Sequence, residues 1–363
     1  MSKIPVMLVD DSKVVREFLK EIINSQKDMH VTAAASNGIE ALGMIAEKHP
    51  KIVILDYQMP EMNGLETLEQ IIKLYPGIKV IMFSSYTTQG AKLTIKALTS
   101  GAADFLPKPG SKGIEMDNAG VYLEEKLVPK IRELSRSNYR KNKVIEDIKI
   151  DPVRNLRQKV FDKKTLALEG CYNYCAVGIS TGGTIALKKL LSRVPGDING
   201  SILITIHMPA MFTCQLAEDL NKNSELKVFE AKDGMTVEKG AAYITPGSHH
   251  MKLIKSGIGL KIVLLDSPPY KSCKPSVNIM FSSLLDISPA QTIAVIMTGM
   301  GDDGYEAMLK LHRKNAYLLA QDKDSCVVFG MPSKPVKEKL VHDSLDIQGL
   351  AERISFLLGT NNV

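Results

Sequence analysis

Short apolar runs alternate with amphipathic helical stretches along this 363-residue chain. Residues 4–9 form a continuous apolar run, and residues 13–24 then repeat apolar side chains at helical spacing. This alternation of strand and helix predicts a parallel sheet with helices on both faces. Such a sheet carries its functional groups at the carboxyl ends of its strands. The expected strands of the first part are Ile4–Val9, Val31–Ala35, Ile52–Leu55, Val80–Phe83 and Ala102–Phe105.

The same alternation resumes near residue 172. Helix patterns at 183–191 and at about 303–313 each lie between two strand patterns. Residues 226–265 differ, because they indicate only short strands separated by turns. The chain is therefore predicted to form two α/β domains: a (βα)5 domain, then a three-layer, doubly wound, mostly parallel α/β domain. The expected strands of the second part are Cys175–Ile179, Ser201–Ile206, Ile293–Met297 and Ala316–Leu319.

The net charge of +6 is concentrated in one middle segment. Residues 1–125 hold 13 Lys/Arg and 16 Asp/Glu, residues 126–170 hold 13 and 6, and residues 171–363 hold 20 and 18. We place the first domain at 1–125, a basic interdomain linker at 126–170 and the second domain at 171–363, although the last helix pattern of the first part continues towards Leu134. A basic segment can bind nucleic acid or an anionic membrane. A solvated linker is favoured, because neither neighbouring domain is strongly basic.

Other global features exclude several classes of protein. No apolar run approaches the roughly 18 residues of a membrane span, so no membrane insertion is expected. The N-terminal residues do not form a secretory signal. The five cysteines include no C-x-x-C pair, which indicates free thiols in a reducing cytoplasm and no zinc or disulfide framework.

Carboxylates, a hydroxyl and a lysine follow the expected strands of the first part. Asp10 and Asp11 come after its first strand, Asp56 after the third, Ser84 ends the fourth and Lys108 follows the fifth. Any single Asp at a strand end is explained by turn formation or helix capping. Five such residues meeting at one edge of the sheet instead predict a site that binds Mg²⁺ and a phosphoryl group. Asp56 is the candidate nucleophile.

This set, with the segment Met59–Gly64 after Asp56, resembles the receiver domain of two-component response regulators. The resemblance implies a flavodoxin-like fold in which the three carboxylates hold Mg²⁺ and a histidine kinase phosphorylates Asp56. Lys108 would pair with the phosphoryl group and Ser84 would hydrogen-bond to it. Phe105 matches the aromatic switch position of the family.

A second set of chemically active residues starts at Gly178–Gly183, where an expected strand meets an expected helix. The segment fits the nucleophile elbow G-x-S-x-G, with Ser180 as the nucleophile. It also fits a loose glycine-rich phosphate loop or a tight turn that needs glycine. The segment alone does not decide among these, but no Walker lysine follows Gly183.

Two further strand ends favour nucleophilic catalysis. His207 follows the strand 201–206, and Asp303 follows the strand 293–297. A serine needs a base to accept its proton, and the base needs a carboxylate to hold its tautomer. The chain order Ser180, His207, Asp303 differs from the Ser, Asp, His order of α/β-hydrolases, which argues against that family but not against the chemistry.

The second part resembles the catalytic domain of the CheB family of chemotaxis methylesterases. The resemblance implies that Ser180 is the nucleophile, His207 the general base and acid, and Asp303 its orienting carboxylate, with Asp302 as the neighbouring alternative. The segments that carry it are Ser180–Gly183, His207–Pro209, Thr245–Met251, Lys274–Asn278, Thr298–Gly304 and Gln321–Pro332.

The chain departs from the family pattern near these segments. Ile206 stands where the family usually has Gln, Lys274 where it has Arg, and Asn278 where it has Asp. These changes can alter how substrate is positioned, because Lys lacks the planar fork of Arg. The backbone amides of Thr181 and Met300 are the candidate oxyanion hole.

Taken together, the resemblance implies an enzyme that removes γ-methyl esters from glutamates of methyl-accepting chemoreceptors, releases methanol and deamidates specific receptor glutamines. It implies activation by phosphorylation, through a receiver that covers the active-site rim until Asp56 is modified. No cofactor is expected at the esterase site. Two rival classes remain. One is a non-enzymatic response regulator whose second domain binds a partner or nucleic acid, and the near-neutral charge of residues 171–363 disfavours DNA binding. The other is a generic esterase for small molecules. The pair His249-His250 is expected to be structural or part of the substrate rim, with metal binding as the alternative.

Overall fold

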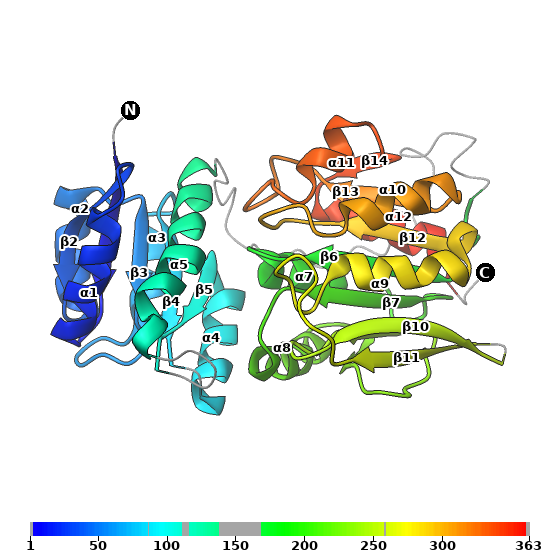
Figure 1. Ribbon diagram of the computed structural model, residues 1–363, viewed down its shortest axis with the longest axis horizontal. Helices are drawn as coiled ribbons and strands as arrows, with labels where there is room; N and C mark the ends of the chain where they lie inside the picture. The colour runs from blue at the N-terminus through cyan, green and yellow to red at the C-terminus, as the bar shows by residue number, and fades with distance from the viewer. Residues whose placement is uncertain (1–2, 86, 111–115, 138–167, 258, 361–363) are drawn as a thin grey trace. The chain divides into compact units, whose positions relative to one another are not determined.

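The computed structural model describes residues 3–85, 87–110, 116–137, 168–257 and 259–360. The chain divides into two compact units, residues 1–141 and 142–363 (Figure 1). Each unit has a parallel sheet with helices on both faces, so the predicted two-domain α/β fold is confirmed.

The first unit is a five-stranded parallel sheet in the order β2-β1-β3-β4-β5. The central strands are buried on both faces, as their unbroken apolar sequence requires. The chain order reverses between β1 and β3, which makes their carboxyl ends the switch point of the sheet. The elements are β1 (Ile4–Val9), α1 (Lys13–Asn24), β2 (Met29–Ala35), α2 (Gly38–Lys48), β3 (Ile52–Leu55), α3 (Gly64–Leu74), β4 (Lys79–Ser84), α4 (Thr88–Ser100), β5 (Asp104–Pro107) and α5 (Ala119–Arg136), with a 3₁₀ turn at Met116–Asn118.

Helix α5 corrects the predicted boundary of the first domain. The boundary at residue 125 falls inside this helix, which continues to Arg136. Leu127, Ile131 and Leu134 extend the buried stripe of the helix into the basic segment. The part of the predicted linker at 138–167 lies outside the described residues.

The second unit is a seven-stranded sheet in the order β14-β13-β12-β6-β7-β9-β8, with every neighbouring pair parallel. Its strands are β6 (Tyr174–Ile179), β7 (Ser201–Ile206), β8 (Lys227–Glu230), β9 (Ala241–Ile244), β12 (Thr292–Ile296), β13 (Tyr317–Gln321) and β14 (Asp343–Leu345). The short strands expected at 226–265 are β8 and β9 of this sheet and a separate antiparallel hairpin of β10 (His250–Ser256) and β11 (Gly259–Leu265).

Helices cover both faces of this sheet. Helices α9 and α10 and the β10–β11 hairpin pack on one face around Met280, Phe281 and Met308, and α7 and α12 pack together on the other (Figure 1). The chain order reverses between β6 and β12, so the switch point of this sheet lies at their carboxyl ends. The helices are α7 (Gly183–Leu191), α8 (Ala210–Lys222), α9 (Val277–Ser283), α10 (Tyr305–Arg313), α11 (Ser333–Lys337) and α12 (Ile347–Leu358), with 3₁₀ turns at Leu284–Asp286 and Pro289–Gln291.

Candidate functional site

The switch point of the first unit brings its acidic residues and its lysine together. Asp10 directly follows β1 and Asp56 directly follows β3, and both are buried. The ammonium group of Lys108, beyond β5, lies 2.7 Å from Asp10 Oδ2 and 2.9 Å from Asp56 Oδ2. Asp11 is exposed at the edge of the pocket. The ends of β1, β3 and β5 thus assemble the predicted acidic pocket around one lysine.

The electrostatics of this pocket favour a bound cation. Burial raises the pKa of Asp56, the charge of Asp10 adds to this, and Lys108 and the Tyr57 amide oppose it. Burial lowers the pKa of Lys108, but the two buried carboxylates outweigh burial and raise it. Asp10, Asp11 and Asp56 each offer one carboxylate oxygen, and these three oxygens lie within 4.8 Å of one another. An all-carboxylate donor set of this size suits Mg²⁺.

The segment 59–64 is explained by the close approach of α3 to Asp56. A Cβ on Gly64 would lie 2.1 Å from the Asp56 carbonyl oxygen, so no other residue fits there without moving the backbone. Asn63 caps α3 in a capping box with Glu66. The motif therefore fixes where the chain turns after the candidate phosphoryl acceptor.

Ser84 and Phe105 lie on the neighbouring strands β4 and β5. Phe105 is buried and pairs in register with Met82. The Ser84 hydroxyl is also buried and shares a 2.7 Å hydrogen bond with Thr94 of α4. In this structure the hydroxyl of Ser84 is therefore engaged with α4.

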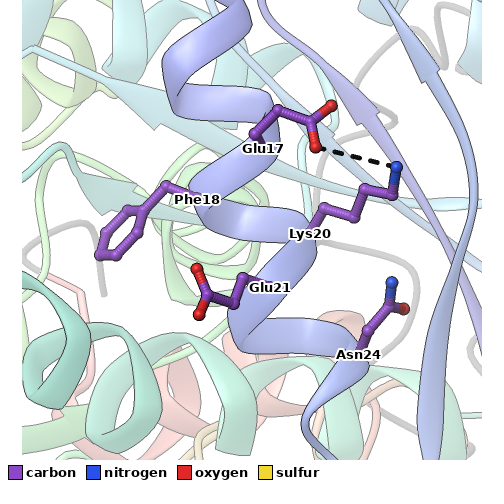
Figure 2. A pocket seen from close by; sticks show the side chains of 5 residues that line it. All are labelled: Glu17, Phe18, Lys20, Glu21 and Asn24. Carbon is purple, nitrogen blue, oxygen red and sulfur yellow. Dashed lines mark ion pairs between the residues drawn. The ribbon is translucent and has the colours of Figure 1, made fainter.

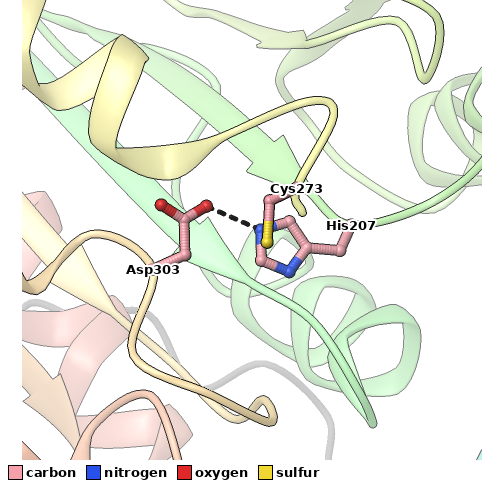
Figure 3. Close-up of side chains that lie close together, drawn as sticks. All are labelled: His207, Cys273 and Asp303. Atoms are coloured by element: carbon pink, nitrogen blue, oxygen red, sulfur yellow. Dashed lines mark hydrogen bonds and ion pairs between the residues drawn. The ribbon is translucent and has the colours of Figure 1, made fainter. Parts of the chain in front are cut away.

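The switch point of the second unit carries the predicted serine, histidine and aspartate. Ser180 follows β6, and its amide donates to the carbonyl of Thr298 beyond β12. His207 follows β7, and its amide donates to the Ile179 carbonyl, one residue before Ser180. The His207 ring nitrogen Nε2 lies 2.8 Å from Asp303 Oδ2 (Figure 3). All three residues therefore lie at adjoining strand ends, and Nδ1 is the ring nitrogen left to accept a proton.

Asp303 is held at the N-terminus of α9. The amides of Val277 and Asn278 donate to its carboxylate at 2.7 and 3.0 Å, and the Ser276 hydroxyl donates at 2.9 Å. A helix N-terminus stabilises a negative charge, which keeps this buried carboxylate ionised. Asp302 is exposed, so the structure brings Asp303, and not the alternative Asp302, to His207.

The pKa shifts of the pair have opposite directions. Burial lowers the pKa of His207, but hydrogen bonds with Asp303 and Cys273 outweigh it and raise this pKa to about 9. Burial raises the pKa of Asp303, but His207 and the two α9 amides outweigh it and lower this pKa. The carboxylate therefore stabilises the imidazolium, as a base that accepts a serine proton requires.

Glycines bring the loops together around Ser180. A Cβ on Gly299 would lie 2.7 Å from the Ser180 Cβ, so the loop after β12 can approach the serine only with glycine there. Gly182 adopts a φ of +77° before α7, which explains the glycine in the turn. The candidate oxyanion-hole residues flank this contact: Thr181 follows Ser180, and Met300 follows Gly299.

Two positions that depart from the family pattern make structural contacts. Lys274 Nζ lies 2.6 Å from Asp266 Oδ1. The Asn278 side-chain oxygen accepts a hydrogen bond from the Ala307 amide at 3.0 Å, which ties α9 to α10. Ile206 is buried at the end of β7.

Cys273 was missed by the sequence analysis. Its thiol lies beside the His207 ring, on the side of Asp303 (Figure 3). No short motif joins these residues, since they are far apart in the sequence.

His250 is structural: its Nδ1 accepts a hydrogen bond from the Ser276 amide, and its Nε2 lies 3.1 Å from the Pro268 carbonyl oxygen. His250 thus has both ring nitrogens engaged, in agreement with the structural interpretation of that histidine.

A shallow hollow lies on α1 of the first unit (Figure 2). It has a volume of about 450 Å³, and none of the predicted site residues lines it. The lining residues of the hollow are Glu17, Phe18, Lys20, Glu21 and Asn24.

Among the described residues, no helix combines the length and the apolar character needed to span a membrane.

Known proteins match both units. The family model described as CheB methylesterase matches residues 175–354, and that described as response regulator receiver domain matches residues 6–115. A protein-glutamate methylesterase/protein-glutamine glutaminase from Pectobacterium atrosepticum is 38% identical over 354 residues, which are 98% of this chain and 97% of that protein. The chain belongs to the CheB methylesterase family. The predicted family and methylesterase class are therefore confirmed.

Further relatives match each part or the whole. A protein of the same name from Trichodesmium erythraeum is 35% identical over 360 residues, 99% of this chain and 100% of that protein. The Thermotoga maritima CheB methylesterase catalytic domain, known from a crystal structure, is 34% identical in sequence to the matched part of this chain, with a TM-score of 0.49. The match covers 50% of this chain and 97% of the Thermotoga domain. The response regulator domain of the same CheB is 42% identical, with a TM-score of 0.32, and covers 36% of this chain and 94% of that chain.

Proposed function

We propose that this member of the CheB family hydrolyses γ-methyl esters of glutamate side chains on chemoreceptors and deamidates receptor glutamines, with Ser180, His207 and Asp303 as its catalytic triad. The observation that carries this proposal is the 2.8 Å contact between His207 and Asp303 beside the strand end that bears Ser180. The names of the relatives support the substrate class, because they specify protein-bound glutamate and glutamine.

The reaction is an acyl transfer in two halves. His207 Nδ1 accepts the Ser180 hydroxyl proton while Oγ attacks the ester carbonyl carbon. The carbonyl oxygen becomes an oxyanion, for which the amides of Thr181 and Met300 are the proposed donors. His207 then gives its proton to the departing methoxide, and methanol leaves with Ser180 acylated. Water repeats the sequence and releases the glutamate and the free serine. A glutamine substrate follows the same course with ammonia as the leaving group.

Throughout both halves Asp303 keeps the His207 ring in one orientation and stabilises the imidazolium. It stays ionised because α9 supplies two amides and a hydroxyl to its oxygens. Asp303 is therefore a positioning residue, and its removal impairs the base without removing it.

Regulation is assigned to the first unit. A histidine kinase supplies the phosphoryl group, Asp56 accepts it, and Lys108 pairs with its oxygens. Asp10, Asp11 and Asp56 would hold Mg²⁺, which neutralises the charge of the phosphoryl oxygens when bound. The Ser84 hydroxyl exchanges Thr94 for a phosphoryl oxygen. Phe105, on the adjacent strand, responds as the aromatic switch of the unit.

Methanol release from methylated chemoreceptor, with parent and Ser180→Ala proteins, tests the activity. We expect kcat to fall by roughly 10⁴–10⁶-fold in Ser180→Ala, because the triad acts as a unit. Ser192→Ala is the matched control, since this exposed serine is the C-cap of α7, the helix that follows Ser180, and the variant should keep parental activity. A Ser180→Ala protein that releases methanol at a rate near that of the parent overturns the assignment.

A further inference from the structure

Three metal-ligating side chains meet in the second unit. A ring nitrogen of His207, the sulfur of Cys273 and a carboxylate oxygen of Asp303 all lie within 4.8 Å of one another (Figure 3). The His207 nitrogen that faces Asp303 is Nε2, at 2.8 Å. Nitrogen, sulfur and oxygen donors at such separations are the donor set of protein zinc sites.

Cys273 is held at this position by a tight turn. Tyr270 and Cys273 exchange two backbone hydrogen bonds of 3.0 Å, and the residues between them, Lys271 and Ser272, have φ values of +48° and +67°. Positive φ at both central positions is the conformation of a type I′ turn. The Tyr270 hydroxyl and the Lys271 ammonium both bond to Glu306 at the start of α10. The thiol is therefore carried on a turn that is fixed to the same segment as Asp303.

The charges around the cluster favour a cation. The two lysines nearest to Cys273 in the sequence are already paired, Lys271 with Glu306 and Lys274 with Asp266. Asp303 is ionised, and Asp302 adds an exposed carboxylate beside it. A divalent ion bound by a thiolate, a carboxylate and a neutral imidazole makes a set with no net charge, which lowers the cost of holding the ion in a half-buried place.

We propose that His207, Cys273 and Asp303 form an inhibitory site for a thiophilic divalent cation such as Zn²⁺. The ion takes the place of the proton between Nε2 and Asp303, the imidazole carries its proton on Nδ1, and the Cys273 thiol releases one proton to solvent. The Nδ1 lone pair that accepts the Ser180 proton is thereby lost. The site rests on the geometry and charges of these side chains, and its inhibitory effect rests on the proposed function.

The receiver pocket provides an internal contrast. Its ligands are carboxylates alone, which suit Mg²⁺, whereas imidazole and thiolate favour zinc over magnesium. The full-length protein can therefore be kept in excess Mg²⁺ while a second metal is added. Co²⁺ serves as the spectroscopic probe, because a thiolate bound to it produces a charge-transfer absorption band that carboxylates do not.

The direct test is a titration of full-length parent, Cys273→Ser and Cys214→Ser proteins with Co²⁺ in excess Mg²⁺. Cys214 is an exposed cysteine on α8 and serves as the matched control. We expect the thiolate-to-cobalt band in the parent and in Cys214→Ser, and its loss in Cys273→Ser. Absence of the band in the parent, or its persistence in Cys273→Ser, overturns the site.

Inhibition is measured in the same proteins with Zn²⁺, each relative to its own metal-free rate of methanol release. We expect the half-inhibiting Zn²⁺ concentration to rise by at least about tenfold in Cys273→Ser and to stay unchanged in Cys214→Ser. Equal inhibition of parent and Cys273→Ser contradicts the inhibitory role. A parent protein that releases no methanol even without metal defeats the proposed function, whereas the cobalt band still decides the metal site.

Discussion

The two units place their functional residues at the same topological position but balance charge differently. In the first unit the chain order reverses between β1 and β3, and Asp10 and Asp56 follow those strands. In the second unit it reverses between β6 and β12, where Ser180 and Asp303 lie. Both sites form at the carboxyl ends of strands, as expected of open parallel sheets.

The difference lies in what faces the buried carboxylates. In the receiver Asp10 and Asp56 each accept one backbone amide, from Ser12 and Tyr57, but the charge that they share is a lysine ammonium and, in the family, Mg²⁺. Both cations can also bind a phosphoryl group. In the esterase the partners of Asp303 are fixed amides, a hydroxyl and one imidazole. A parallel sheet therefore supplies the place for a site. The groups that balance the buried carboxylates decide whether the site can bind and release a phosphoryl group or serves one imidazole only.

After Ser180→Ala, the largest effect is expected from Asp303→Asn. We expect kcat to fall by about 10⁴-fold, because the imidazole loses the carboxylate that holds its tautomer and stabilises its charge. Asp302→Asn is the matched control, since this neighbouring carboxylate is exposed, and it should change kcat by less than about threefold. The measurement is methanol release from methylated receptor. A large loss in Asp302→Asn with little loss in Asp303→Asn would reverse the assignment of the two residues.

The pH dependence should show the raised pKa of His207. The neutral imidazole is the active base, so kcat/KM should rise about tenfold per pH unit below the pKa of about 9 and level off above it. The Asp303→Asn inflection should lie at lower pH, because one of the two groups that raise the pKa of His207 loses its charge. Rates measured with Ser180→Ala correct for spontaneous ester hydrolysis. A profile that is flat between pH 6 and 9 contradicts imidazole as the base.

Removing the receiver's central carboxylate should affect control and spare the chemistry. We expect a phosphodonor to stimulate the parent by about 5–150-fold, the usual range of coupling between two sites, and to leave Asp56→Asn at the unstimulated rate. Asp117→Asn, at an exposed carboxylate of the same unit, should respond like the parent. The assay compares methanol release with and without phosphodonor. Stimulation that survives in Asp56→Asn would show that another residue accepts the phosphoryl group.

The smallest effects concern the glycines that let each loop approach its site. Gly64→Ala and Gly299→Ala should each destabilise their own unit by about 1–3 kcal/mol, because the new methyl group overlaps the Asp56 carbonyl or the Ser180 side chain. Gly43→Ala should instead stabilise by about 1 kcal/mol, since this helical glycine has open space around it. Urea unfolding gives the three values. Stabilisation by all three would show that the loops are not as close as described.

The sequence was sufficient for residues whose position depends on one strand. Asp10, Asp56, Ser180 and His207 each directly follow a short apolar run, so the strand pattern alone predicts their common edge. Asp303 lies farther beyond β12, and the family spacing was needed to prefer it to Asp302.

The sequence was insufficient where position depends on several elements. Cys273 reaches His207 only through the turn at 270–273 and its attachment to Glu306, which no local pattern records. The basic composition of residues 126–170 predicts the end of the first domain too early. The apolar spacing of Leu127, Ile131 and Leu134, which continues the helix, is the signal that places it correctly. The roles of the Thr181 and Met300 amides remain predictions, since they depend on the orientation of single peptide groups.

The central claim is that Ser180, His207 and Asp303 act as one unit. The most direct measurement is kcat for methanol release by Ser180→Ala, Asp303→Asn and the double variant, in parallel with the parent. We predict that the double variant matches Ser180→Ala within about threefold, because Asp303 acts only through the base that serves Ser180. Losses that multiply in the double variant would contradict the account, since they would show that the two residues contribute independently.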